Sequence, residues 1–366
     1  MFETLLILIF IRPFISSLAF PYLNSIYSAL LLTLLIIWFI FKGVSPSKIV
    51  PLKYPLILFS LALIISVVFS INPLNSLAEL YKYINGILLL LIGVSLSDGN
   101  KIRLIRTIAL AGLVISLLAI YQYFFGFQHV LNYISKEKIT NPFALEYLTQ
   151  KRVFFPFVTP NTLAGYLAMI IPLALICKNR IVCLIPLCSA LLSTKSLGAS
   201  ISLLVALSLY GYLEGKIEKR RIILLIGLII TIGLVFIARV TVTKGHLHPL
   251  FSTLMRLNYW KNTLKIIQNH PIIGVGLGNF NLMQTRYAHN SYLQIWVEMG
   301  ILGIISILWL IATVLKPVFK NIKDSPNKNQ LIALLAAVAV FLIHNLVDFS
   351  FYLPEISFIW WIILGL

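Results

Sequence analysis

Long apolar runs constrain this chain more than any other feature of its sequence. A helix needs about 20 predominantly apolar residues to cross the hydrocarbon core of a bilayer. Runs near that length recur along the chain, at about residues 4–20, 25–41, 54–70, 78–96, 103–126, 160–177, 181–194, 197–213, 222–240, 290–315, 330–347 and 352–366. The sequence therefore predicts an all-α, polytopic membrane protein with about 12 transmembrane helices, forming a single domain over residues 1–366.

The composition agrees with that class. Hydrophobic residues make up 60% of the chain and charged residues only 11%, whereas soluble domains carry about 25% charged residues. A net charge of +18 would suggest nucleic acid as the partner of a soluble protein. In a membrane protein, Lys and Arg gather in cytoplasmic loops instead, so we expect membrane lipid and no nucleic acid. The three cysteines have no metal-ligand spacing and are expected to be small buried hydrophobes.

The basic residues also predict the orientation of the helices, because they occur in alternate loops. Pro21–Asn24 and Ile71–Leu77 contain no Lys or Arg. The other short loops contain Lys42, Lys48, Lys53, Lys101, Arg103, Arg106, Lys178, Arg180, Lys216, Lys219, Arg220, Arg221, Lys316, Lys320, Lys323 and Lys328. The positive-inside rule then places both termini in the cytoplasm and two long segments, 127–159 and 241–289, on the outer face.

The first outer segment, 127–159, is rich in aromatic and basic residues. An interfacial loop explains most of them, with rings at headgroup depth and basic groups facing lipid phosphate. Arg152 is the candidate exception, because it directly precedes the turn that leads into the next helix. Thr159-Pro160-Asn161 is typical of a helix start, with Thr as the N-cap and Pro in the first position.

The second outer segment follows the ninth expected helix and begins with a helical pattern over 252–268. At 100° per residue its apolar positions cluster on one side, which predicts a short amphipathic helix on the membrane surface. Arg256 falls at the buried edge of that side, whereas Lys261 and Lys265 face water. The edge position leaves three roles open for Arg256: contact with lipid headgroups, pairing with a carboxylate, or binding a ligand phosphate.

Three glycines at 274, 276 and 278 follow that helix. Nucleotide binding is disfavoured, because no strand precedes the Gly-x-Gly-x-Gly pattern and the segment is expected on the outer face. We expect turn glycines that bring the backbone close to a cavity.

His289-Asn290 opens the tenth expected helix, and the eleventh carries His344-Asn345 with Asp348 one turn later. A His at a helix start is often a cap, although a neutral imidazole is also a suitable base near pH 7. Ionisable groups inside a membrane are costly and are usually functional or paired. The His344–Asp348 pair can therefore belong to a site or simply satisfy itself.

Together these segments resemble the O-antigen ligase and O-antigen polymerase superfamily of bacterial lipid-linked glycan transferases. The resemblance covers the chain from about Arg152 to the C-terminus. Its motifs are Asn161-Thr-Leu-Ala-Gly-Tyr-Leu-Ala168, Arg256 with Trp260, Pro271-Ile-Ile-Gly-Val-Gly-Leu-Gly-Asn-Phe280, His289-Asn-Ser-Tyr-Leu-Gln294 followed by Glu298-Met-Gly-Ile-Leu-Gly303, and His344 to Asp348. The long outer loop between helices 9 and 10 also matches that family's layout.

The resemblance implies transfer of a glycan from an undecaprenyl diphosphate carrier to an acceptor, without metal or cofactor, at the periplasmic side of the inner membrane. It places the family's loop arginine at Arg256, its loop histidine at His289 and its late acidic residue at Asp348. The family commonly has Ser-Arg-Gly where this chain has Ser196-Leu197-Gly198. Lys195 or Arg152 is then the candidate for the missing second diphosphate ligand.

The chemistry of these residue types fits that activity. Cationic side chains can stabilise a diphosphate leaving group, and His289 can take the proton of the acceptor hydroxyl, with inversion expected for a single displacement. We therefore expect His289 and Arg256 to be catalytic. The other expected site residues are Lys195, Arg152, Trp260 and Asn290 as substrate-binding groups, and Asn161, His344 and Asp348 as supporting groups.

The acceptor remains open at this stage. The short chain favours ligation to lipid A-core, and the alternatives are an O-antigen polymerase or a protein O-oligosaccharyltransferase. A transporter or flippase for lipid-linked glycan is the alternative of another class. A transporter built from two six-helix halves would have its long loop after helix six, whereas the long loop of this chain is expected after helix nine.

Overall fold

The computed structural model describes residues 1–44, 46–137, 147–215, 251–283 and 285–366, and between 216 and 250 only residues 223, 227 and 230–235. Within the described residues, β-type backbone pairing is limited to an isolated bridge between Leu282 and Thr285. The helices are α1 (Phe2–Ile11), α2 (Pro21–Lys42), α3 (Pro46–Ile49), α4 (Lys53–Val68), α5 (Pro73–Ser95), α6 (Asp98–Tyr121), α7 (Phe127–Glu137), α9 (Pro160–Ala174), α10 (Arg180–Thr194), α11 (Leu197–Glu214), α13 (Phe251–Asn269), α14 (Ser291–Asn321), α15 (Lys328–His344) and α16 (Pro354–Gly365).

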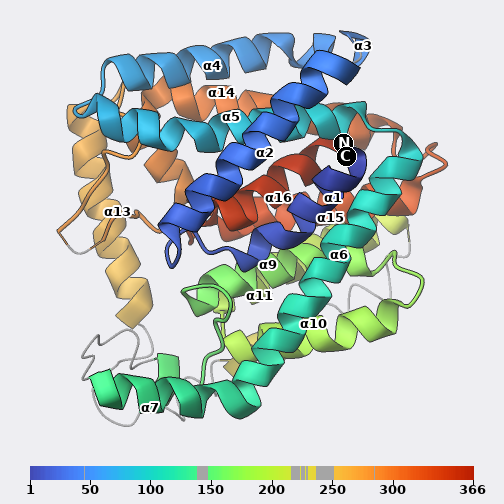
Figure 1. Ribbon diagram of the computed structural model, residues 1–366, viewed down its shortest axis with the longest axis vertical. Coiled ribbons are helices and arrows are strands. Elements are labelled where there is room, and N and C mark those ends of the chain that lie inside the picture. The colour runs from blue at the N-terminus through green and yellow to red at the C-terminus, as the bar shows by residue number, and fades with distance from the viewer. Residues whose placement is uncertain are drawn as a thin grey trace.

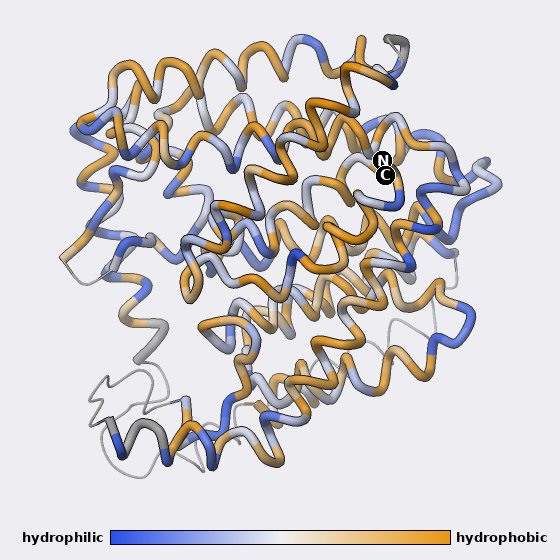
Figure 2. The backbone as a smooth tube through the Cα atoms, in the orientation of Figure 1, coloured by the Kyte–Doolittle hydropathy of each residue, from blue (hydrophilic) through white to orange (hydrophobic). Residues whose placement is uncertain are grey.

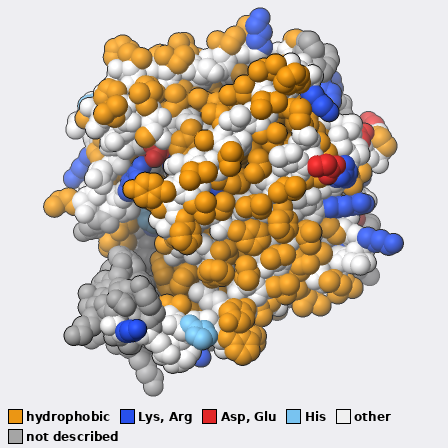
Figure 3. All heavy atoms as spheres, viewed as in Figure 1, with side chains coloured by type: hydrophobic (Ala, Val, Ile, Leu, Met, Phe, Trp, Pro, Cys, Tyr) orange, Lys and Arg blue, Asp and Glu red, His pale blue; other side chains and the backbone are white. Residues whose placement is uncertain are grey.

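Several of these helices are suited to a membrane. In the described parts of the chain, six helical stretches are long and apolar enough to span one: Pro21–Lys42, Val50–Val68, Pro73–Ser95, Asp98–Asn132, Leu197–Glu214 and Ser291–Asn321. Helices α9, α10, α15 and α16 are shorter but also apolar. Figure 3 shows a broad hydrophobic surface with basic side chains towards its edges. The chain is an all-helical membrane protein, and the count of twelve spans stays a prediction.

Two expected helices differ in detail from the structure, and a third is mostly not described by it. Helix α1 stops at Ile11 and is followed by the 3₁₀ turn η1 (Arg12–Phe14), because Pro13 cannot donate a helical hydrogen bond. The rest of the expected 4–20 run, residues 15–20, is not helical. The helix expected to end at 126 continues through a π turn into α7. The expected helix at 222–240 lies mostly outside the described residues.

Helix α16 forms the centre of the core. Every residue from Pro354 to Gly365 is buried, as expected for a helix that is apolar on all sides. Helix α5 packs against it at glycines: a Cβ on Gly86 would meet the indole of Trp361, and one on Gly93 would meet the backbone of Gly365. Small residues allow helices to approach this closely.

The bundle has two distinguishable ends. Helices α4, α5 and α14 run side by side, and α13 crosses their ends (Figure 1). We call the end with α13 and the connection 69–72 the outer end. Both chain termini lie at the opposite, inner end, where Arg103 pairs with Glu3 at 2.7 Å. Figure 2 shows hydrophilic residues gathered towards these ends, with mostly apolar helix between them.

Candidate active site at the outer end

His289 stands directly before α14, in a conformation fixed by its neighbours. Its φ of 52° is left-handed, and the Asn290 side chain accepts hydrogen bonds from the backbone N–H groups of Tyr292 and Leu293. Asn290 is therefore the N-cap of α14. The Ala288 N–H donates to the Gln294 side chain at 3.1 Å, which also holds the chain on the other side of His289.

The start of α14 is tied to the end of α15 by Ser291. The Ser291 hydroxyl donates to the Asn345 side-chain oxygen at 2.6 Å and approaches the Asp348 backbone oxygen at 3.2 Å. The Ser291 N–H donates to the Asn345 carbonyl at 2.9 Å. Two motifs more than 50 residues apart in sequence are thereby brought together, as a shared site requires.

Asp348 is fully buried beside His344. The His344 Nε2 lies 3.3 Å from the Asp348 Oδ2, and the Ser350 hydroxyl donates to the same carboxylate oxygen. A Cβ on Gly165 of α9 would lie 2.5 Å from the His344 ring. The absence of a side chain at Gly165 therefore makes room for His344, which connects the 161–168 motif to this pair.

The His289 ring is enclosed by aromatic side chains. It stacks on Tyr259 with ring centres 5.6 Å apart and meets the edge of Phe349 at 4.8 Å. The Trp260 indole N–H donates to the His289 carbonyl at 3.4 Å. The His289 Nδ1 is buried and has no hydrogen-bond partner within the described structure. Burial lowers the pKa of His289 to about 4; the Asp348 carboxylate opposes this shift and the Arg256 cation adds to it.

Arg256 of α13 is largely buried, but the apolar side expected for this helix is only partly so, because Leu257 and Leu264 are exposed. Lys261 and Lys265 of the same helix are exposed, whereas Tyr259 and Ile267, which share a helix face with Arg256, are buried. Burial lowers the pKa of Arg256, and the Asp348 carboxylate raises it. Arg256, His289 and Asp348 therefore lie within electrostatic range of one another.

Arg152 is held at a second position by three neighbours. Its Nε donates to the Thr194 carbonyl at 3.0 Å, and its Nη2 donates to the Asn161 side chain at 3.1 Å. Its guanidinium carbon lies 5.5 Å from the Tyr147 ring centre. Tyr147 also interacts electrostatically with Arg256. Arg152 and Arg256 thus both lie near one tyrosine.

Lys195 adjoins Arg152 at the end of α10. Its backbone is left-handed with φ 54°, and its Nζ donates to the Gln150 carbonyl at 2.7 Å. Burial lowers the pKa of Lys195, and the Arg152 and Lys151 cations lower it further. Thr159 caps α9 and Pro160 occupies its first position, which confirms the expected helix start beside Asn161.

The glycine run packs against a break in α14. Gly300 has φ 66° and ψ −170° and interrupts the helix. The N–H groups of Val275 and Gly276 donate to the carbonyls of Val297 and Glu298 at 2.8 and 3.0 Å. The glycines thus allow close contact between backbones, and a Cβ on Gly276 would collide with Ser70.

Beside this run, a cleft of about 400 Å³ opens between Asn75 and Glu79 of α5 and the residues 278–281 with Arg286. Arg286 pairs with Glu79 at 2.8 Å, and Glu79 also contacts Lys82. The neighbouring Tyr287 stacks on Phe349 at 4.2 Å, which in turn contacts His289. The cleft is therefore linked to His289 by two aromatic rings.

Sequence reasoning missed the pairing of Arg286 with Glu79. A signal was present, because Glu79 and Lys82 lie one turn apart inside an expected transmembrane run and such charges are usually paired or functional. The buried Arg12, which donates to Asn24 at 2.7 Å and pairs with Glu355 at 3.4 Å, was missed for the same reason.

Comparisons with known proteins agree with the motifs. A protein of Haemophilus influenzae (strain Rd) named only "Uncharacterized protein" is 24% identical over an alignment of 232 positions, which covers 54% of this chain and 52% of that protein. The chain thus spans about half the length of this curated relative. A family model described as O-antigen ligase matches residues 181–308, the region that holds Lys195, Arg256, Trp260, His289 and Asn290. The resemblance to the O-antigen ligase family is therefore confirmed over residues 181–308 of this chain.

Proposed function

We propose that this protein is an inverting glycosyltransferase that moves a glycan from an undecaprenyl diphosphate carrier to an acceptor on the outer face of the inner membrane. The match to the O-antigen ligase family supports a lipid-linked glycan transferase of the ligase or polymerase type. The observation that carries the proposal is the convergence of Arg256, His289 and Asp348 at the outer end.

In this proposal, Arg256 binds the diphosphate and stabilises the charge that grows on it as the glycosidic bond breaks. A largely buried guanidinium is suited to this, because its interaction with phosphate is poorly screened and can use two hydrogen bonds. Asp348 stabilises the charged form of Arg256, since its carboxylate lies within electrostatic range. His344 and Ser350 in turn hold that carboxylate.

Arg152 and Lys195 supply further positive charge to the diphosphate. Arg152 has a guanidinium already oriented by Asn161 and Thr194, and the family's usual arginine is replaced by Leu197. Arg152 is the better candidate for a bidentate contact, because the Lys195 ammonium is a point charge. Asn161 then acts through Arg152, while Asn290 acts by capping the helix that carries His289.

His289 accepts the proton of the acceptor hydroxyl as that oxygen attacks the anomeric carbon. Its pKa of about 4 keeps the imidazole neutral near pH 7, which is the form that can accept a proton. A bound diphosphate adds negative charge close to Arg256 and therefore raises the pKa of His289 towards the range of an effective base. Trp260 supports this role through its hydrogen bond to the His289 backbone.

The cleft beside Arg286 is a suitable place for glycan. Amide and carboxylate side chains that line it, such as Asn75, Glu79 and Asn279, form hydrogen bonds with hydroxyl groups. We propose lipid A-core as the acceptor and O-antigen ligation as the reaction. A second lipid-linked repeat, as in a polymerase, and a protein, as in an O-oligosaccharyltransferase, are the other acceptors to test.

The orientation in this proposal rests on the alternation of basic loops, which places both termini in the cytoplasm and the outer end in the periplasm. A lipid-linked glycan flippase is the proposal's main competitor, and transfer chemistry distinguishes the two. The purified protein in lipid nanodiscs should join a lipid-linked glycan to lipid A-core, with and without a chelator. Flipping of lipid-linked glycan in vesicles without any transfer to the three acceptors would replace the enzyme by a transporter.

A further inference from the structure

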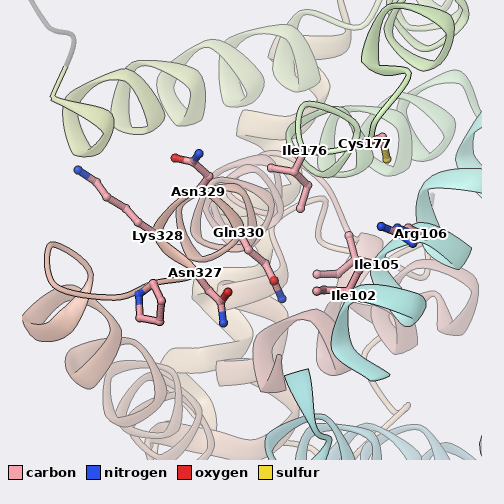
Figure 4. A pocket seen from close by; sticks show the side chains of 10 residues that line it. Ile102, Ile105, Arg106, Ile176, Cys177, Asn327, Lys328, Asn329 and Gln330 are labelled. Atoms are coloured by element: carbon pink, nitrogen blue, oxygen red, sulfur yellow. The ribbon is translucent and has the colours of Figure 1, made fainter. Parts of the chain in front are cut away.

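The basic groups of the inner-end cavity do not converge on one point. This cavity has a volume of about 350 Å³ and lies between the first turns of α6, the residues after α9 and the start of α15 (Figure 4). Its two basic side chains, Arg106 and Lys328, point in different directions, and Lys328 points away from the cavity (Figure 4). Polar groups that do converge lie instead in the outer half of α14, around Glu298.

Glu298 is a buried acidic residue about two turns into α14, with 2% of its surface exposed. Its backbone carbonyl is fixed from two sides, because the Ser66 hydroxyl of α4 donates to it at 2.9 Å and the Gly276 N–H donates to it at 3.0 Å. The ion pairs found between described residues do not include Glu298. Ionisable groups within membrane-spanning helices are costly and are usually functional or paired, so the position of Glu298 favours a functional role.

The hydrogen-bond partners of the Glu298 side chain are both donors. Its Oε1 accepts a hydrogen bond from the Gln294 Nε2 at 3.1 Å, and its carboxyl group also accepts one from the Gly278 backbone N–H. A carboxylate has two acceptor oxygens and no donor, whereas a glutamine amide has one oxygen and one NH₂ group. The surroundings of position 298 are therefore matched to a carboxylate.

Glu298 determines which way the Gln294 amide points. Because the Gln294 Nε2 donates to Glu298, the Gln294 Oε1 faces the other way and accepts the Ala288 N–H at 3.1 Å. Ala288 is fully buried and directly precedes His289, whose backbone is left-handed with φ 52°. Asn290 fixes the other side of His289 as the N-cap of α14. The Gln294 amide thus connects the Glu298 carboxylate to the backbone at His289.

We propose that Glu298 is a positioning residue for His289. Its carboxylate holds the Gln294 amide in the orientation that accepts the Ala288 N–H, and this bond keeps His289 left-handed between its aromatic neighbours. A non-glycine residue stays in such a conformation only where its surroundings hold it. The inference rests on the proposed function, in which His289 takes the proton of the acceptor hydroxyl and Glu298 does not touch substrate.

Glycosyl transfer by Glu298→Gln protein in nanodiscs tests this proposal. The substitution keeps the size of the side chain but turns one of its acceptors into a donor, which then faces an N–H group. A misplacement of about 1 Å can cost about 10²-fold in rate, so kcat should fall at least about ten-fold. The KM for the lipid-linked donor should stay within about two-fold of wild type, because Arg256 and Arg152 are unchanged. The matched control Glu3→Gln removes the same charge from an exposed position at the inner end and should transfer like wild type.

A reciprocal exchange, Gln294→Glu/Glu298→Gln, separates the hydrogen-bond pattern from charge and size. The carboxylate at 294 then accepts the Ala288 N–H and the amide N–H from 298, while the amide oxygen at 298 accepts the Gly278 N–H. The kcat of this exchange variant should return to within about five-fold of wild type. Gln294→Glu alone places two carboxyl groups face to face and should remain at least about ten-fold slow. Wild-type kcat in Glu298→Gln, or an exchange variant no faster than the two single variants, would overturn the proposal.

Labelling of His289 with diethyl pyrocarbonate gives a second measurement that needs no substrate. The His289 ring is enclosed by aromatic side chains, whereas His270 is exposed and serves as the internal reference. Relative to His270, His289 should react at least about three-fold faster in Glu298→Gln than in wild type or the exchange variant, because its backbone is released. An unchanged labelling rate in Glu298→Gln would contradict the positioning role. If wild-type protein transfers nothing, the proposed function fails, and the labelling still decides whether Glu298 holds His289.

Discussion

The break in α14 at Gly300 leads us to expect that Gly300→Ala strongly destabilises the protein. Gly300 adopts φ 66° and ψ −170°, a region that is essentially restricted to glycine. A Cβ at this position would lie 1.9 Å from the Ile272 carbonyl oxygen. That oxygen belongs to the backbone of the glycine run, so the run itself would have to move away from α14.

The expected cost follows from these contacts. A non-glycine residue in such a conformation costs about 1–3 kcal/mol. Displacing the run also disrupts three backbone hydrogen bonds, in which the N–H groups of Val275, Gly276 and Ile301 donate to carbonyls at 2.8–3.1 Å, each worth about 1 kcal/mol. The free energy of unfolding should therefore fall by about 4–6 kcal/mol.

Reversible unfolding in mixed detergent micelles measures this free energy. Gly99→Ala is the matched control, because nothing lies within 4 Å of a Cβ at Gly99 and its φ is not positive; its stability should stay within about 0.5 kcal/mol of wild type. If Gly300→Ala unfolds within 1 kcal/mol of wild type, the run does not pack against the break as described. A stable but inactive Gly300→Ala protein would equally refute the magnitude given above.

Three further predictions concern the proposed site. The kcat/KM for glycosyl transfer should stay level as the pH is lowered from 8 to about 6, and should fall as the pH passes through about 4. The reason is that the lowered pKa of His289 keeps its imidazole neutral down to that pH. A midpoint near pH 6.5 in the pH–rate profile would contradict this. Arg152→Lys should lower the free energy of unfolding by about 1–3 kcal/mol, since one ammonium cannot replace both hydrogen bonds of the guanidinium, to Asn161 and to the Thr194 carbonyl; chemical denaturation with no change would argue against it. Gly165→Ala should push His344 away from Asp348 and reduce transfer at least ten-fold, whereas wild-type rates in the same assay would show that this pair is not needed.

The sequence predicted the helical elements well, because bilayer thickness fixes the length of an apolar run. Helices α2, α5 and α11 begin and end within a few residues of the expected limits, apart from the polar first turn of α5. Helical periodicity separated Arg256 from the exposed lysines of α13, but it also placed Leu257 and Leu264, which are exposed, on the buried side. Thr159 was identified as an N-cap from its position before Pro160, and its side chain does accept the Thr162 N–H.

Other features depend on contacts between distant segments, which a single sequence does not reveal. The sequence suggested an uninterrupted helix through Gly300, because a glycine inside an apolar helical pattern is usually tolerated. Only the packing of the 271–276 segment explains the break there. The pairing of Arg286 with Glu79 likewise joins residues more than 200 positions apart. Local sequence patterns do not show which residue of α5 lies next to the loop that carries Arg286.

The central claim is that His289 and Arg256 act on a lipid-linked glycan. Its most direct test is the rate of transfer from undecaprenyl diphosphate glycan to lipid A-core by His289→Ala and Arg256→Ala proteins in nanodiscs, beside the exposed α13 control Lys261→Ala. A general base contributes about 10²–10⁴-fold to a rate. His289→Ala should therefore transfer at least 100-fold more slowly, Arg256→Ala should show a comparable loss, and Lys261→Ala should match wild type. Full transfer by a folded His289→Ala protein, or an equal loss in all three variants, would contradict the claim.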